Sequence, residues 1–125
     1  MLKITEISER IYDIEILEPK ESEDEVLFLD FMDKILRKEA FGLILSVSGD
    51  KGFSQDGKRK LSMWFKNNKR DLSSRCIGFA RVSSHSTKVS RLKNRTLTLA
   101  MPCPYRVFES RDESIEWMSK MKLKK

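Results

Sequence analysis

The apolar run FGLILSV, residues 41–47, constrains the fold more than any other stretch of the chain. It is short, carries no charged residue and is rich in aliphatic side chains, which is typical of a strand buried on both faces of a sheet. A sheet that contains such a strand needs helices to cover it. The run therefore predicts an α/β fold with this strand near the centre of the sheet.

Segments on either side of this run predict four more strands. KITEIS and IYDIEIL alternate apolar with polar residues on the two sides of the short turn at 8–10. This alternation predicts a β-hairpin with strands near 2–7 and 11–17 and with one buried face. CIGFARVS predicts a buried strand at 76–83, and PYRVF predicts the last strand.

Capping boxes mark the starts of two helices. Ser22-x-x-Glu25 and Ser110-x-x-Glu113 each place a hydroxyl and a carboxylate where they satisfy unpaired backbone donors reciprocally. The first box opens a predicted helix over 23–39, and the second opens the C-terminal helix.

Two basic segments predict the remaining helices. KRKLSMWFKNNKRDL, residues 58–72, carries a stripe at helical spacing formed by Leu61, Trp64, Phe65, Asn68 and Leu72. HSTKVSRLKNRTLTLAM, residues 85–101, predicts a second basic helix, although Thr96 and Thr98 favour strand. The order β-β-α-β-α-β-α-β-α predicts a mixed, mostly parallel five-stranded sheet with an N-terminal hairpin and about four helices, in one domain over 1–125.

Composition places the chain among cytoplasmic globular proteins. Of its 125 residues, 39% are hydrophobic and 35% charged, and its apolar runs fall short of the about 20 residues that a membrane-spanning helix needs. The N-terminus lacks the apolar segment of a secretory signal. Cys76 and Cys103 have no CxxC or Cys/His neighbours, so we expect reduced, buried thiols and neither a disulfide nor a zinc site. No cofactor or metal is expected.

Charge divides the chain into two halves. Residues 1–50 carry 6 Lys/Arg and 13 Asp/Glu, whereas residues 51–125 carry 19 and 6. The basic half would attract an acidic partner, which leaves nucleic acid, an anionic lipid and an acidic protein surface open. A basic surface that serves solubility alone is an equal alternative.

The element order resembles that of the STAS superfamily, above all the SpoIIAA-like branch of small bacterial proteins. The run FGLILSVSG leading into a loop and a helix, and YRVFES leading into the helix that bears IEWM, carry this resemblance, which covers nearly the whole chain. It implies the fold of anti-sigma-factor antagonists, which is also compared with a family of lipid-binding domains. It also implies a non-enzymatic regulatory module that binds a protein, such as a kinase or an anti-sigma-like regulator, and that can form a homodimer.

The loop after the central strand has a special role in this family. In its phosphorylatable members the loop carries Asp-Ser-Ser/Thr-Gly, and a kinase modifies the hydroxyl just before the glycine. FSQDG places Ser54 at the aspartate position and Asp56, a permanent charge, just before Gly57. The resemblance thus implies a partner-binding loop at 49–57 that lacks its usual switch, with Ser54 as a displaced phosphorylation site. The loop residues predicted to bind are Asp50, Gly52, Ser54, Asp56 and Gly57.

The same stretch argues against nucleotide hydrolysis. It contains Gly52-x-x-x-x-Gly57-Lys58, but Arg59 stands where a P-loop has the Ser or Thr that holds magnesium. Anion binding at the helix N-terminus and glycines that serve turn geometry both stay open. His85, the single histidine, lies in a polar cluster without a nucleophile motif, so we predict a capping or solvated residue and no catalytic residue.

Trp64 and Phe65 lie among basic residues, an arrangement that also occurs on surfaces that bind nucleic acid or membranes. Their helical stripe favours packing on the sheet while the cations extend outward. The predicted basic contact face consists of Lys58, Arg59, Lys60, Lys66 and Arg70. Lys88, Arg91, Lys93 and Arg95 would extend this face if both basic helices share one side of the sheet.

The leading hypothesis is therefore a non-enzymatic protein-binding module that uses loop 49–57 and the following basic helix. Two alternatives stay open. One is a carrier of a small molecule or a lipid head group, and the other is nucleic-acid binding by the basic half.

Overall fold

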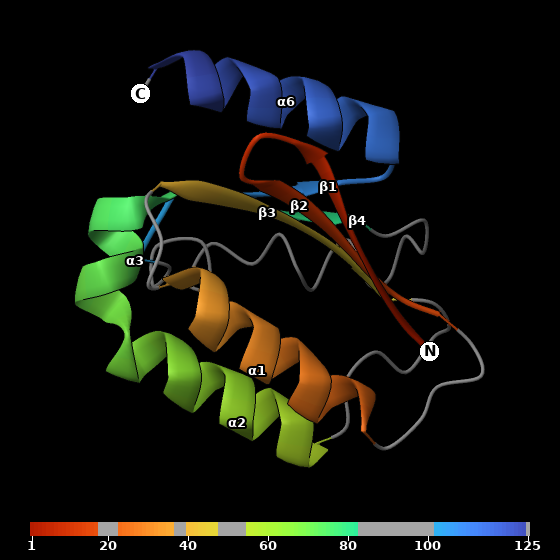
Figure 1. Ribbon diagram of the computed structural model, residues 1–125, viewed down its shortest axis with the longest axis vertical. Helices are drawn as coiled ribbons and strands as arrows, with labels where there is room; N and C mark the ends of the chain where they lie inside the picture. The colour runs from red at the N-terminus through yellow and green to blue at the C-terminus, as the bar shows by residue number, and fades with distance from the viewer. Residues whose placement is uncertain (18–22, 37–39, 48–54, 83–101, 125) are drawn as a thin grey trace.

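A computed structural model describes residues 1–17, 23–36, 40–47, 55–82 and 102–124. Figure 1 shows a sheet with described helices on both of its faces. The strands are β1 (Leu2–Ser8), β2 (Ile11–Ile16), β3 (Phe41–Val47), β4 (Cys76–Val82) and β5 (Tyr105–Phe108). The predicted strands are all present, with ends that differ by one or two residues.

The strands follow one another across the sheet in chain order, from β1 at one edge to β5 at the other. β1 and β2 pair antiparallel, whereas the pairs β2–β3, β3–β4 and β4–β5 are all parallel. The predicted mixed sheet with an antiparallel hairpin at its start is therefore confirmed.

Among the described residues, one face is covered by α1 (Asp24–Leu36), α2 (Gln55–Asn67) and α3 (Lys69–Arg75). They enclose the larger core cluster, to which the sheet contributes the side chains of Tyr12, Ile14, Ile16, Leu43, Leu45 and Phe79. From the helices come Phe28, Met32, Ile35, Trp64 and Leu72. Burial of this apolar surface is the main term that holds the helices on the sheet.

The C-terminal helix α6 (Arg111–Lys124) crosses the opposite face. Gly42 of β3 and Gly78 of β4 are direct partners in the sheet, and a Cβ on Gly42 would lie 2.6 Å from Met118 Sδ. A Cβ on Gly78 would lie 3.0 Å from the Trp117 ring. The paired glycines thus form a notch that lets α6 approach the sheet closely.

The predicted single buried face holds for β1 and is wrong for β2. β1 alternates between half-buried and exposed residues, whereas β2 is buried on both faces because α6 covers its second face. Asp13 lies on that second face with 1% of its surface exposed. The covered carboxylate is tolerated because the Arg111 guanidinium forms an ion pair with it, and Arg111 Nε also lies 3.8 Å from Glu15 Oε1.

The helix predicted over 58–72 begins earlier and is interrupted. α2 already begins at Gln55, and Asn68 separates it from α3 with φ −114° and ψ 21°. Asn68 Nδ2 donates to the Trp64 carbonyl at 2.9 Å, and the Asn68 N–H donates to the same oxygen at 3.0 Å, so the side chain and the backbone share this acceptor. Figure 1 shows α3 turned away from the axis of α2.

Two further predictions on local structure are confirmed, and others fall on residues that the structure does not describe. The Glu113 N–H donates to Ser110 Oγ at 3.4 Å, which confirms the cap of α6. Cys76 and Cys103 are free, buried thiols, as predicted. Ser22, His85 and the basic helix over 85–101 lie outside the described residues, as do residues 37–39 of the first predicted helix.

Candidate functional site

The predicted basic contact face is on the surface of the molecule. Lys58, Arg59, Lys60 and Lys66 are exposed on α2, and Arg70 is exposed on α3. Figure 1 shows α3 turned away from α2, so Arg70 lies on a helix that runs in another direction from the one that carries the other four cations. We call the exposed side of α2 that carries these four residues and Met63 the α2 face.

An apolar side chain lies in the middle of the α2 face. Met63 is 56% exposed, and it follows Arg59 by four residues and precedes Lys66 by three. At this spacing the three side chains form one stripe along the helix. The α2 face thus offers a flexible hydrophobic side chain between two long cations.

Asp56 is the acidic residue of the α2 face. Its carboxylate accepts a hydrogen bond from Arg59 at 2.8 Å and lies 3.1 Å from the Lys60 ammonium. Hydrogen bonds from Lys60 and Arg59 lower the pKa of Asp56. Asp56 therefore stays ionised and orients two of the cations, although such exposed pairs contribute little to stability.

The predicted binding loop, residues 49–57, is wrong at its C-terminal end, because its last three residues are helical. Asp56 and Gly57 lie in the first turn of α2, and Gly57 is buried, so it is not part of an exposed contact surface. A Cβ on Gly57 would collide with the Glu25 carboxylate, so this glycine lets α2 pack closely on α1. Asp50, Gly52 and Ser54, the remaining loop residues, lie outside the described residues.

Trp64 and Phe65 hold α2 in place from its inner side, as their spacing predicted. Trp64 is 9% exposed, and its Nε1 donates to Asp33 Oδ1 of α1 at 2.5 Å. The Phe65 ring meets Phe79 of β4 edge to face with the centroids 5.6 Å apart. The two rings therefore fix which side of α2 faces outward and are not a stacking surface for bases.

Two charged side chains within strands were not selected from the sequence. Besides Asp13, Arg81 lies in β4 with its Nε buried beneath neighbouring atoms. Burial lowers the pKa of Arg81, and burial also raises the pKa of the neighbouring Tyr105. For Arg81 the available signal was a charged residue inside the otherwise apolar strand CIGFARV, whereas Asp13 fits the alternation of IYDIEI and gave no such signal.

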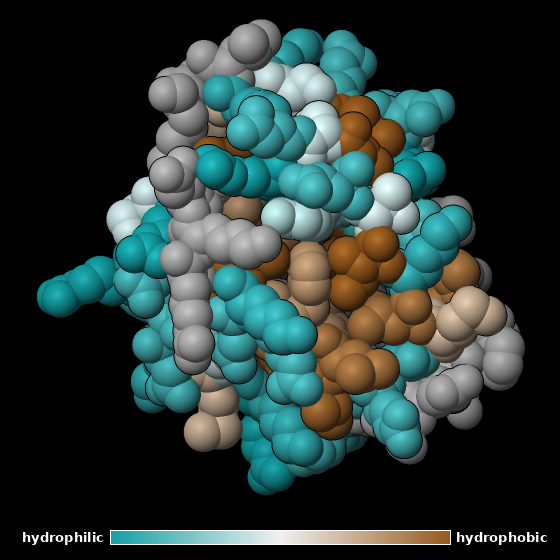
Figure 2. Space-filling model, in the orientation of Figure 1, coloured by the Kyte–Doolittle hydropathy of each residue, from teal (hydrophilic) through white to brown (hydrophobic). Residues whose placement is uncertain are grey.

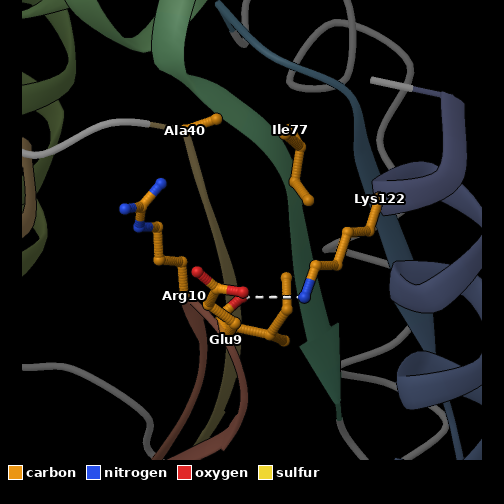
Figure 3. A pocket seen from close by; sticks show the side chains of 6 residues that line it. Glu9, Arg10, Ala40, Ile77 and Lys122 are labelled. Carbon is orange, nitrogen blue, oxygen red and sulfur yellow. Dashed lines mark hydrogen bonds between the residues drawn. The ribbon is translucent and has the colours of Figure 1, made fainter.

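A cavity of about 190 Å³ lies at the opposite end of the sheet from the start of α2. It is bounded by the β1–β2 turn, the first residues of β2 and β4, and the last turns of α6 (Figure 3). Its lining consists of Glu9, Arg10, Ile11, Ala40, Ile77 and Lys122. Nothing in the local sequence points to this cavity, because its walls come from four separate parts of the chain.

The described residues contain neither a candidate metal site nor a candidate membrane-spanning helix. Among the described residues, no three His, Cys, Asp or Glu side chains are grouped so that they could hold a metal ion. Within the same part of the chain, no helix combines the length and the hydrophobicity that crossing a bilayer requires.

Comparison with known proteins leaves the α2 face and the cavity to be interpreted from their own chemistry. The chain matches no protein-family model, no curated protein and no solved structure.

Proposed function

We propose that this chain is a non-enzymatic regulatory module that binds an acidic surface of another protein through the α2 face. The observation that carries the proposal is the exposed Met63 between Arg59 and Lys66 on a helix whose inner side is anchored. Methionine and arginine are enriched in the cores of protein interfaces, where a flexible thioether adapts to the partner. The STAS-like fold that the resemblance implies is part of the same proposal.

The charges would act mainly on the rate of association. Over α2 the chain carries four basic residues and one acidic residue, all with exposed side chains. Such a field steers an acidic partner toward the helix and fixes its orientation, while the desolvated contact around Met63 supplies affinity. Asp56 keeps Arg59 and Lys60 extended along the helix before binding.

The other two functions have less support among the described residues. Nucleic acid would use the same cations, but its phosphates offer Met63 no apolar partner, and Trp64 is not available for stacking. The cavity of about 190 Å³ is smaller than the roughly 300–1,000 Å³ of pockets that hold drug-sized ligands, so it does not suit a lipid.

Charge reversal on the α2 face tests the proposal. The full chain and the variant Arg59→Glu/Lys66→Glu would be used as baits in nuclease-treated extract, followed by cross-linking at lysine and mass spectrometry. We expect specific acidic proteins whose cross-links map to Lys58, Lys60 or Lys66, and their loss from the variant.

A matched control keeps the change in net charge equal. Lys3→Glu/Lys120→Glu reverses two exposed lysines on β1 and α6, neither of which belongs to the α2 face. This control should retain every partner. Recovery of the same partners by both variants would contradict the proposal. Partners that are recovered from untreated extract but lost from nuclease-treated extract would contradict it as well.

A further inference from the structure

We propose that the cavity at the β1–β2 turn binds a small aliphatic monocarboxylate. Arg10 and Lys122 would hold the carboxylate, and Ile11 and Ile77 would contact the hydrocarbon chain. This site is separate from the α2 face, so either proposal can fail without the other.

The size and the walls of the cavity define the class of ligand. Ile11 is the first residue of β2, Ile77 is the second residue of β4, and Ala40 directly precedes β3. Ile11 and Ile77 are nearly fully buried, at 3% and 4% exposure, so they form a fixed apolar base. A cavity of about 190 Å³ lies below the size range of most ligand pockets, which restricts the ligand to a few carbon atoms.

Among the described residues, two cations and one carboxylate lie at the mouth of the cavity. Arg10 and Lys122 extend on opposite sides of it, and Glu9 contributes one carboxylate (Figure 3). Lys122 Nζ donates to the backbone carbonyl of Glu9 at 3.0 Å, which fixes the ammonium at the rim. An ammonium has three donors, so this bond leaves capacity for a ligand oxygen. Charge-assisted hydrogen bonds from both cations suit a carboxylate.

The backbone of Arg10 gives an independent reason to assign it a role. Its φ is 63°, in the left-handed region that glycine adopts freely and that side chains disfavour. Two hydrogen bonds hold it there, because its N–H donates to Glu6 Oε2 and its carbonyl accepts from Gly42 N–H, both at 2.9 Å. A long cationic side chain stands at a position where glycine costs less, and its five donors can serve a ligand oxygen besides the contacts that Arg10 already makes.

A titration with three probes of equal chain length tests the assignment. Hexanoate, hexan-1-ol and hexylamine would be added to the ¹⁵N-labelled full chain, and amide chemical shifts would be followed. Hexanoate should give saturable shifts at Ile11, Gly42 and Ile77, whereas hexylamine should give none because of the two cations. Equal responses to hexanoate and hexylamine, or no saturable shift with hexanoate, would overturn the proposal.

Two variants separate binding from folding. Arg10→Gly removes the guanidinium and relieves the backbone, so the chain should stay folded while hexanoate affinity falls by roughly tenfold. Lys122→Met keeps the side-chain stem and should cause a similar loss. Lys120, two residues earlier in α6, is exposed and ion-paired with Glu116, so Lys120→Met should bind hexanoate as the unmodified chain does. Glu9→Gln should strengthen binding. Unchanged affinity in both Arg10→Gly and Lys122→Met would refute the proposal.

Discussion

α1 and α2 have the same length, 13 residues, and lie side by side on the same face of the sheet, yet they have opposite character (Figure 1). α1 carries four acidic residues and one basic residue, and α2 carries four basic residues and one acidic residue. α1 buries five of its residues, whereas α2 buries Gly57 and Trp64. One helix therefore builds the core, and the other is supported by it.

The difference in burial explains why α2 is the better candidate for recognition. Phe28, Met32 and Ile35 of α1 are at most 1% exposed, so the position of α1 is set by the core. α2 rests on α1 through the Trp64–Asp33 hydrogen bond and on the sheet through Phe65. Figure 2 shows mainly hydrophilic residues over α2, while hydrophobic residues gather between α1 and α6. A helix supported in this way can expose most of its surface at little cost in stability.

Truncation of a core side chain of α1 should have the largest effect. Phe28→Ala leaves a cavity between α1 and the sheet, and we expect it to lower the free energy of unfolding by about 3–5 kcal/mol. Urea unfolding followed by circular dichroism measures the change. Met63→Ala on the α2 face serves as the control and should leave stability nearly unchanged, because its side chain is already exposed. Similar losses in both variants would contradict the division between the two helices.

Removal of the hydrogen bond between the helices should have an intermediate effect. Trp64→Phe keeps an aromatic ring but removes the indole N–H, and we expect a loss of about 1 kcal/mol. Thermal unfolding would measure it. Asp33→Asn keeps a side-chain oxygen that can accept from the indole, so it should cost less than Trp64→Phe. The opposite order would show that this hydrogen bond does not join the helices.

A methyl group at position 57, where α2 packs closely on α1, should have a small effect on stability. In Gly57→Ala the new Cβ meets the end of the Glu25 side chain, which can rotate outward, and alanine is the better helix former. We expect stability to change by less than about 1 kcal/mol. Gly57→Leu, whose side chain cannot be accommodated in this way, should be clearly less stable in the same unfolding assay. Equal stability of Gly57→Ala and Gly57→Leu would show that α2 does not pack closely on α1 at this position.

The ion pairs of Asp56 should have the smallest effect, and it should depend on pH. Hydrogen bonds from Lys60 and Arg59 lower the pKa of Asp56 in the folded state, so the stability it contributes is present above about pH 4 and is lost as the pH falls further. Asp56→Asn should therefore lower the melting temperature slightly at pH 7 and match the unmodified chain near pH 2. A difference that persists at pH 2 would have another cause.

Regular periodicity made most of the secondary structure predictable. The alternation in KITEIS, the apolar run of β3 and the Ser110 cap of α6 depend on residues that are close in sequence. The break at Asn68 was missed because asparagine fits the helical stripe by position, and its side-chain hydrogen bond to the Trp64 carbonyl shows only in three dimensions. The early start of α2 was missed because glycine at position 57 resembled part of a loop.

The candidate sites were predictable to different degrees. The α2 face was predictable from a run of cations around an amphipathic stripe. Helical spacing alone places Trp64 on the buried side of the helix and Lys66 on the exposed side. The cavity was not predictable, because Arg10 and Lys122 are brought together by the packing of α6 on the sheet. The burial of Asp13 was hidden for the same reason, as its partner Arg111 comes from the last helix.

The sequence by itself determined the order of the five strands, the mixed sheet and the basic character of α2, because each depends on local periodicity, caps and charge. Tertiary structure decided which residues of β2 meet α6, why glycines stand at positions 42, 57 and 78, and where a cavity remains. These features arise where distant segments pack together, and their energies depend on the fit between surfaces that are far apart along the chain.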